Sequence, residues 1–230
     1  MKIISFPLVI TGALIGSFFT ELTQKTKVLA DDSRLTYNVN EKNRLEGAYF
    51  VENTNRDIWI RGAYKENQRV GNWYAFNNDK TVALRYNYDL KKVIFLDTLA
   101  LKKAEITIVD EKAKGNGSIT LPICSIDQYL SLLKQAAKSS FPKDQIIYNK
   151  EIPIEIIANV KSSNDVSYTI SYTLNEKLYA FDINNKNIDF DIEWIPSTSN
   201  GKNIEAEFSI KSSLLFSANG SEKQRFKWNY

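Results

Sequence analysis

The densest group of carboxylates in the sequence is formed by Asp189, Asp191 and Glu193. On a β-strand, alternate side chains share one face and lie about 7 Å apart. That spacing suits the acid pair of a glycosidase or part of a calcium site. The residues that alternate with the acids are all apolar: Ile188, Phe190 and Ile192. A strand with one solvated face therefore explains the acids, and the tight glycine turn of a calcium loop is missing, so we predict no catalytic or metal-binding role.

Histidine is absent from the sequence, and Cys124 is the only cysteine. Without histidine, Ser-His-Asp and Cys-His mechanisms are excluded, and zinc and copper sites lose their commonest ligand. A single cysteine excludes an internal disulfide and a cysteine-cluster metal site. Cys124 precedes a candidate helix cap, where a thiol pKa can be lowered, but we expect a small, buried apolar residue. The sequence therefore predicts no enzyme activity and no cofactor.

Aromatic residues form the other candidate site. Tyr64, Trp73 and Tyr74 would provide a surface for a glycan or a peptide if they were exposed, and would pack between neighbouring hairpins if they were not. Three basic residues nearby are expected to be solvated: Arg61, Lys65 and Arg69. The outcome depends on which face of a sheet each side chain occupies.

Short strands are expected to position these aromatic residues. Five segments are rich in aromatic and β-branched residues: 45–51, 58–64, 72–76, 82–88 and 93–96. Polar turns such as 66–68 and 77–79 separate them, which is typical of consecutive antiparallel hairpins. The sequence therefore predicts a β-meander over about residues 45–100.

A spacing pattern lies within this meander. Residues 61–76 follow the pattern G-x-Y…R-x-G-x-W-Y-x-F, with Gly62 and Gly71 as its glycines, and residues 47–49 form a weaker copy. Glycine permits a sharp turn or a close approach of a neighbouring side chain. The pattern resembles a MORN-repeat variant of bacterial envelope proteins. That resemblance implies hairpins that stack on one another, because units of this size do not bury a core alone.

The period of the apolar residues changes after the meander. Strands at 105–109 and 118–121 flank a glycine-containing turn at 114–117, which predicts a hairpin. Ser125 is then a candidate helix cap, with Gln128 three residues later as its capping-box partner. Apolar residues at helical spacing follow up to Ala137, and Pro142 is expected to end the helix.

Alternating apolar residues return in the C-terminal part. Four strands are predicted: 154–160, 166–174, 188–194 and 204–210. Together with the helix, they predict an α+β unit of about 100 residues.

Two motifs occur in this C-terminal unit. Residues 140–143 read Ser-Phe-Pro-Lys, and residues 194–204 contain Trp194, Pro196 and Gly201 in the pattern W-x-P-x-x-x-x-G-K-x-V, with isoleucine in the last position. From about residue 125 to 216 the sequence resembles the TonB C-terminal domain. The resemblance implies that 204–216 is an edge strand able to accept an extended partner segment. Glu205 and Glu207 on this strand either block the edge or take part in an interaction surface.

The N-terminus resembles a targeting segment. Lys2 is followed by an uncharged run over residues 3–19, which is shorter than the about 20 residues of a membrane span. A positive start, an apolar run and a later small-residue site predict a signal peptide, cleaved after Ala30. An uncleaved membrane anchor and a buried core helix are the alternatives.

The charge balance argues against nucleic acid as a partner. Removal of residues 1–30 takes the net charge from +3 to +1, with 27 basic and 26 acidic residues left, and basic residues occur in runs of at most two. Nucleic-acid binding usually needs a concentrated basic face. A single cysteine is compatible with an exported chain that needs no disulfide for its stability.

These features predict a β-rich α+β protein with a signal peptide at 1–30, a MORN-like meander at 31–121 and a TonB C-terminal-like domain at 122–230. We expect a non-enzymatic exported protein of the periplasm or cell envelope that binds another envelope protein or itself. A membrane contact is expected only through an uncleaved N-terminal anchor. The alternatives are a glycan-binding module that uses the aromatic meander, a TonB-type energy transducer with an uncleaved anchor, and a hydrolase that uses only carboxylates.

Overall fold

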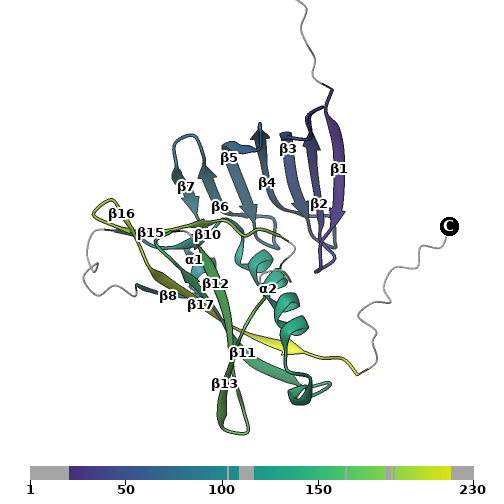
Figure 1. The fold of residues 1–230 in the computed structure, drawn as a ribbon, viewed down its shortest axis with the longest axis vertical. Coiled ribbons are helices and arrows are strands. Elements are labelled where there is room, and N and C mark those ends of the chain that lie inside the picture. Colours follow the sequence, from purple (N-terminus) through teal and green to yellow (C-terminus); the bar gives the residue numbers. More distant parts are fainter. Residues whose placement is uncertain are drawn as a thin grey trace, which may run out of the picture.

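A computed structural model describes residues 21–102, 104–108, 117–163, 165–184, 188 and 190–218. Figure 1 shows two strand-rich units, a meander above and a second sheet below, with the helix α2 reaching from one to the other. The protein is thus β-rich with antiparallel sheets, as the sequence predicts.

The upper unit is a seven-stranded antiparallel sheet whose strands follow one another in sequence order. Its strands are β1 (Thr23–Val28), β2 (Arg34–Val39), β3 (Leu45–Glu52), β4 (Ile58–Lys65), β5 (Gln68–Phe76), β6 (Val82–Asn87) and β7 (Lys92–Leu96). The five predicted strands correspond to β3–β7, so the predicted meander is confirmed. Two residues with positive φ, Glu66 at 49° and Asn67 at 68°, join β4 to β5 as in a type I′ hairpin.

Strand β1 lies within the segment predicted to be a signal peptide. All six of its residues pair with β2, from Thr23 opposite Val39 to Val28 opposite Arg34. The next residue, Leu29, is buried in the core. The apolar run at 3–19 lies outside the described residues, and cleavage after Ala30 stays a prediction. Cleavage at that site would remove β1 and leave β2 as the edge of the meander.

The segment after the meander enters the second unit earlier than predicted. A short helix, α1 (Thr98–Leu101), leads to β8 (Ala104–Ile108), and β9 (Gly117–Ser118) and β10 (Leu121–Pro122) follow. The predicted hairpin between 105–109 and 118–121 is wrong, because β8 pairs with β17 and β9 pairs with β15. Alternate residues of β8, Ala104 and Ile106, pack on the main core, and this burial decides the pairing of the strand. Residues 114–116 of the predicted turn lie outside the described residues.

Helix α2 (Ile126–Ser140) begins after Ser125 and ends before Pro142, as predicted. The predicted capping-box role of Gln128 is wrong, because its buried side-chain amide has no hydrogen-bond partner within the described residues. The hydroxyl oxygen of Ser125 accepts a hydrogen bond from the backbone N–H of Gln128 at 3.2 Å, which satisfies one free donor of the first turn. Phe141 has an extended backbone with ψ of 136°, as expected of a residue before proline, and the helix stops there. A short 3-10 helix, η2 (Lys143–Gln145), leads to the second sheet.

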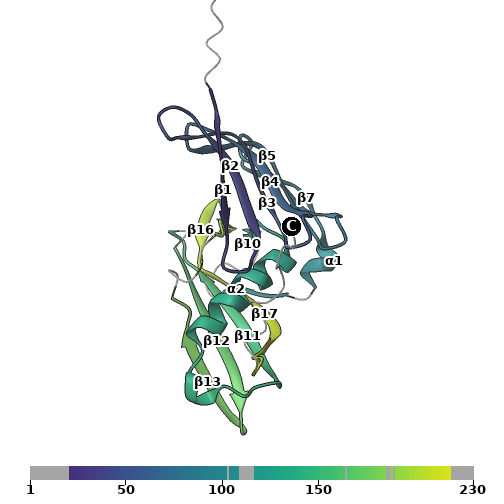
Figure 2. The same ribbon diagram turned by 90° about the vertical axis from the view of Figure 1, so that its right-hand side faces the viewer.

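The second sheet has the strand order β13-β12-β11-β17-β8 and is antiparallel throughout. Its remaining strands are β11 (Glu151–Val160), β12 (Val166–Leu174), β13 (Lys177–Asp182) and β17 (Ala206–Leu215). Smaller sheets are formed by β10 with β14 (Trp194–Ile195), and by β9 with β15 (Ser197–Ser199) and β16 (Lys202–Ile204). Helix α2 covers one face of the second sheet (Figure 2).

Two strand predictions in this unit need correction. The strand expected at 188–194 is not formed: the described residues 188 and 190–193 are irregular, and only Trp194 enters a strand. Phe190 and Ile192 are nevertheless buried, so these alternate apolar side chains pack into the core from an irregular segment. The C-terminal strand β17 is not an edge, because it lies between β11 and β8. The additional strand β13 forms one edge and β8 forms the other.

The two units share one core beneath the meander. A single apolar cluster contains buried residues of the meander (Tyr49, Val51, Ile60 and Trp73), of α2 (Ile126, Tyr129 and Leu133) and of the second sheet (Ile156, Ile170 and Phe208). Two hydrogen bonds link α2 to the upper unit: the backbone N–H of Asn78 donates to Asp127, and the hydroxyl of Ser131 donates to Asp31. The predicted domain division at 121/122 stays a prediction; β8 precedes this position in the chain but pairs with β17 of the second sheet.

Candidate functional site

A row of alternating aromatic and arginine side chains crosses the meander on the face directed away from the core. It consists of Phe50, Arg61, Tyr74, Arg85 and Phe95, which lie opposite one another on β3 to β7. We call it the arginine–aromatic row. With strands about 4.8 Å apart, the row spans about 19 Å.

Contacts within the row hold the guanidinium groups over rings. The guanidinium carbon of Arg61, on β4, lies 5.1 Å from the ring centre of Tyr74 on β5. The guanidinium carbon of Arg85, on β6, lies 5.4 Å from the same ring centre. Phe76 stacks on Tyr74 with ring centres 6.3 Å apart. A guanidinium held flat by a ring keeps its N–H donors free at its edge. The row therefore presents apolar area and hydrogen-bond donors together.

A shallow groove of about 450 Å³ lies beside the row. Its floor is made of small residues: Ala48, Gly62, Ala63 and Gly71. Larger side chains stand around them, among them Phe50, Ile58 and Tyr74. The groove is hollow where the outward-facing Ala48 on β3 and Ala63 on β4 carry only a methyl group and Gly71 on β5 carries no side chain.

The three aromatic residues singled out in the sequence fall on different faces. Trp73 is 1% exposed and packs in the shared core, so it does not contribute to a surface. Tyr64 is half-buried on the same inner face, where its ring meets Trp73 edge to face at 5.3 Å. Tyr74 follows Trp73 and therefore points outward, since successive residues of a strand alternate. Of the three residues, Tyr74 alone belongs to the outer face.

Gly62 is required by the way Trp73 packs. A Cβ atom at position 62 would lie 2.2 Å from two ring carbons of Trp73, far inside van der Waals contact. Glycine at position 71 is favoured for a different reason. No atom lies within 4 Å of a Cβ placed there, but the φ of Gly71 is +62°, a conformation that other residues rarely adopt. It sits where the register between β4 and β5 shifts, so it forms part of a β-bulge.

Substituting Gly62 by alanine is expected to lower the free energy of unfolding by about 3 kcal/mol, because the ring of Trp73 must move within a packed core. Urea denaturation measures the change. Gly71→Ala is the matched control, and its strain at positive φ costs about 1 kcal/mol. In a Trp73→Leu background, the cost of Gly62→Ala should fall clearly, since the clashing ring is gone. An equal cost in both backgrounds would contradict this explanation.

Arg69 occupies an aromatic cage on the inner face. The prediction that it is solvated is wrong, because its side chain is only 10% exposed. Its guanidinium carbon lies 4.4 Å from the ring centre of Trp73, and its N–H groups donate to the hydroxyl oxygens of Tyr64 and Tyr88 at 3.0 and 2.8 Å. An ion pair of 2.7 Å joins it to Glu193. Arg61 and Lys65 are exposed, as predicted.

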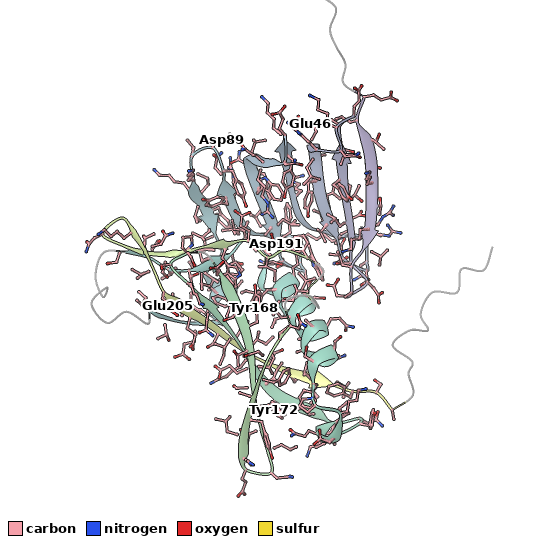
Figure 3. All side chains as sticks on the ribbon, viewed as in Figure 1. Glu46, Asp89, Tyr168, Tyr172, Asp191 and Glu205 are labelled. Carbon is pink, nitrogen blue, oxygen red and sulfur yellow. The ribbon has the colours of Figure 1, made fainter. Side chains whose placement is uncertain are left out.

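The carboxylates at 189–193 have different environments. Glu193 accepts a hydrogen bond from the hydroxyl of Tyr88 at 2.8 Å in addition to its ion pair with Arg69, so it links the second unit to the meander. Asp191 is exposed and lies where the two units approach each other (Figure 3). Asp189 lies outside the described residues. Among the residues that the structure describes, no group of three or more acidic or cysteine side chains is placed to hold a metal ion.

Cys124 is buried, and its burial raises the pKa of the thiol. A thiol held protonated in this way is a poor nucleophile. Its environment is that of a small core residue, with 5% of its surface exposed.

The residues of the C-terminal motif are part of the framework. Trp194 is buried, and its indole N–H donates to the hydroxyl of Tyr168 at 2.9 Å. Pro196 lies between β14 and β15. Gly201, with φ of +73°, forms the two-residue turn between β15 and β16 together with Asn200. Such a turn favours asparagine followed by glycine.

The prediction that Glu205 and Glu207 block an exposed sheet edge is wrong, because β17 is a central strand. On β17, Glu207 lies opposite Asn159 of β11 on one side and Thr107 of β8 on the other. Glu205 is exposed just before that strand, far from α2 (Figure 3). The side chain of Glu207 points away from α2, since its neighbours Ala206 and Phe208 are fully buried on the helix-covered face.

Three members of the row, Phe50, Arg85 and Phe95, were not recognised in the sequence as candidates for a site. Each lies in a predicted strand, and outward arginine or aromatic residues on neighbouring strands were the available signal. Their alignment into one row depends on the β-bulges that shift the register between Arg61 and Ala63 and between Arg85 and Tyr86.

Comparisons of the chain with known protein families, with curated proteins and with solved structures found no match. Within the described part of the chain, no helix has the length and apolar character needed to cross a membrane.

Proposed function

We propose that this chain is a non-enzymatic, exported envelope protein that mediates protein–protein interaction in the periplasm through the outer face of its meander. The observation that carries the proposal is the arginine–aromatic row. Arginine and aromatic residues are enriched at protein interfaces, whereas lysine and acidic residues are depleted there, and the row consists of the enriched types only. Export rests on the apolar run after Lys2 and on the small residues before position 31.

We also propose that the meander is a divergent MORN-repeat variant and that the second unit is a degenerate TonB C-terminal-like domain. The first assignment is supported by Gly62 and Trp73, whose close contact gives a packing reason for the glycine of the pattern. The second is supported by a helix packed on an antiparallel sheet and by the buried Trp194. Capture of a receptor segment at 204–216 is not part of the proposal, because β17 is central.

Chemical crosslinking in intact cells that export the protein tests the proposed function. We expect a crosslinked species for the unmodified chain that is lost in a Tyr74→Ala variant, because the central ring of the row is removed. Tyr148→Ala is the matched control, since Tyr148 is an exposed tyrosine (58%) of the second unit. Tyr74 is half-buried and contacts Arg61, Arg85 and Phe76, so thermal unfolding is measured alongside to show that Tyr74→Ala is folded at the temperature of the assay. Unchanged crosslinking in Tyr74→Ala would reject the proposed surface.

Glycan binding is a second candidate, and the groove beside Tyr74 favours it. Sugar rings stack on exposed aromatic faces, and Asn72 on the groove wall offers a polar amide, whose oxygen accepts from Arg85 at 3.2 Å. Loss of the crosslinked species on treating the cells with glycosidases, with no protein partner recovered, would favour this candidate.

A further inference from the structure

The arginine–aromatic row carries positive charge that the described residues do not neutralise. Carboxylate ion pairs within the described part of the chain include those formed by Arg44, Arg56, Arg69 and Lys80. Neither Arg61 nor Arg85 forms an ion pair with a described carboxylate, and Arg85 donates to the neutral amide oxygen of Asn72. The two guanidinium groups stand two strands apart in one row, which places their backbones about 10 Å apart. A partner that fits this row offers carboxylates at a similar spacing.

A complementary acidic surface lies on the second unit. Alternate residues of its sheet are buried under α2, so the others form an open face on the opposite side. Carboxylates on this open face come from four strands: Glu105 on β8, Glu207 on β17, Glu155 on β11 and Asp182 on β13. Lys211 on β17, opposite Glu155, is a cation of the same face within the described residues. We call this surface the acidic face.

The spacing of two acids on this face fits the row. Glu105 lies opposite Ser209, and Glu207 lies two residues away on the same strand, opposite Thr107. Diagonal neighbours of this kind have backbones about 7–8 Å apart, and long glutamate and arginine side chains easily make up the difference from about 10 Å. A guanidinium and a carboxylate form two parallel hydrogen bonds when they meet edge to edge.

We propose, as a refinement that rests on the proposed function, that the partner is a second copy of this chain, bound head to tail. The arginine–aromatic row of one copy contacts the acidic face of the next, with Arg61 and Arg85 paired to Glu105 and Glu207. A symmetric contact of two rows would place arginine against arginine, which disfavours it. Because the two contacting surfaces differ, the contact is heterologous and can repeat, giving chains of copies.

Sedimentation velocity of the protein, purified as the cell processes it, tests this arrangement. We expect sedimentation to rise with protein concentration at low ionic strength and to fall back toward the monomer value in high salt, since exposed ion pairs are screened. Arg61→Gln/Arg85→Gln and Glu105→Gln/Glu207→Gln are each expected to weaken self-association about tenfold or more. An equimolar mixture of these two variants should form a dimer and nothing larger, because one intact surface of each kind remains.

Charge-matched controls separate a local effect from net charge. Lys42→Gln/Lys150→Gln and Glu41→Gln/Glu176→Gln change exposed residues elsewhere by the same charge, and both should associate like the parent. Thermal unfolding confirms that each variant is folded. A parent chain that stays monomeric, or an arginine variant that still associates, would overturn the proposal.

The crosslinking experiment distinguishes self-association from binding of a different partner to the outer face of the meander. If the parent is monomeric but Tyr74→Ala and Arg61→Gln/Arg85→Gln both lose a crosslinked species, the partner is a different acidic protein, and the proposed function stands without self-association. If neither variant changes the crosslinks, the outer face is not the binding surface, and both proposals fail.

Discussion

Raising the pH above 10 is expected to unfold this protein, because several buried tyrosines hold their protons in the folded state only. Burial is the main cause that raises the pKa of Tyr49, Tyr88, Tyr129 and Tyr168 above the ordinary value of 10.0. In the unfolded chain these hydroxyls ionise near pH 10 and the unfolded state binds fewer protons than the folded one. Their effect on stability is therefore nil below pH 10 and increasingly unfavourable above it.

The expected loss is about 1.4 kcal/mol for each such tyrosine per pH unit above 10. Four tyrosines together therefore remove about 6 kcal/mol by pH 11, which is comparable to the whole stability of many domains. Urea denaturation at pH 8 and at pH 11 measures the difference. Equal stability at the two pH values would show that the tyrosines ionise in the folded protein.

Tyr129→Phe is the matched variant for this prediction. The hydroxyl of Tyr129 is buried and has no hydrogen-bond partner within the described residues. Its removal should therefore leave the stability at pH 8 unchanged or raise it, since an unsatisfied buried hydroxyl is costly. The same variant should reduce the alkaline loss by about 1.4 kcal/mol per pH unit. A variant with the alkaline slope of the parent would contradict the assignment of Tyr129.

Replacing Arg69 by methionine is expected to lower the free energy of unfolding by about 3 kcal/mol. Methionine keeps the apolar stem but removes the guanidinium that holds Tyr64, Tyr88 and Glu193 together. This loss of stability is at the lower end of the range of about 3–5 kcal/mol for breaking a buried ion pair. The side chain of Glu193 is 41% exposed, so water can solvate its carboxylate. Urea denaturation measures the change at neutral pH.

Arg61→Met is the matched control for Arg69→Met. The two arginines lie on neighbouring strands but on opposite faces of the meander, and Arg61 is exposed. Its substitution should change the stability by no more than about 0.5 kcal/mol. Glu193→Gln should cost less in the Arg69→Met background than in the parent, since the pair is already broken. Additive effects would show that the ion pair across the two units contributes nothing.

Features that depend on near neighbours in the chain were predictable. The strands β3–β7 follow from short aromatic-rich segments and polar turns, and α2 follows from Ser125, its apolar spacing and Pro142. Each of these signals acts within one turn or one hairpin, so no distant residue is needed to interpret it. The absence of histidine likewise limits the chemistry whatever the fold.

The candidate site was predictable only in part. Alternation along a strand implies that Trp73 and Tyr74 face opposite sides, but it does not say which side is covered. That was decided by α2 and the second sheet, which bury Trp73 and leave Tyr74 outside. The same packing turned Arg69 inward, although Lys65 and Gln68, in the same hairpin, are exposed.

Composition and local pattern thus determined which segments are strands or helix and which chemistry is missing, whereas the tertiary structure decided how distant segments pair. Strand β8 was expected to pair with residues close in sequence, but it pairs with β17, about a hundred residues later. Phe190 and Ile192 alternate like strand residues, yet they are buried from a loop. For β8, other strands would satisfy the backbone hydrogen bonds equally well, and in both cases the outcome is the arrangement that buries apolar side chains in one core.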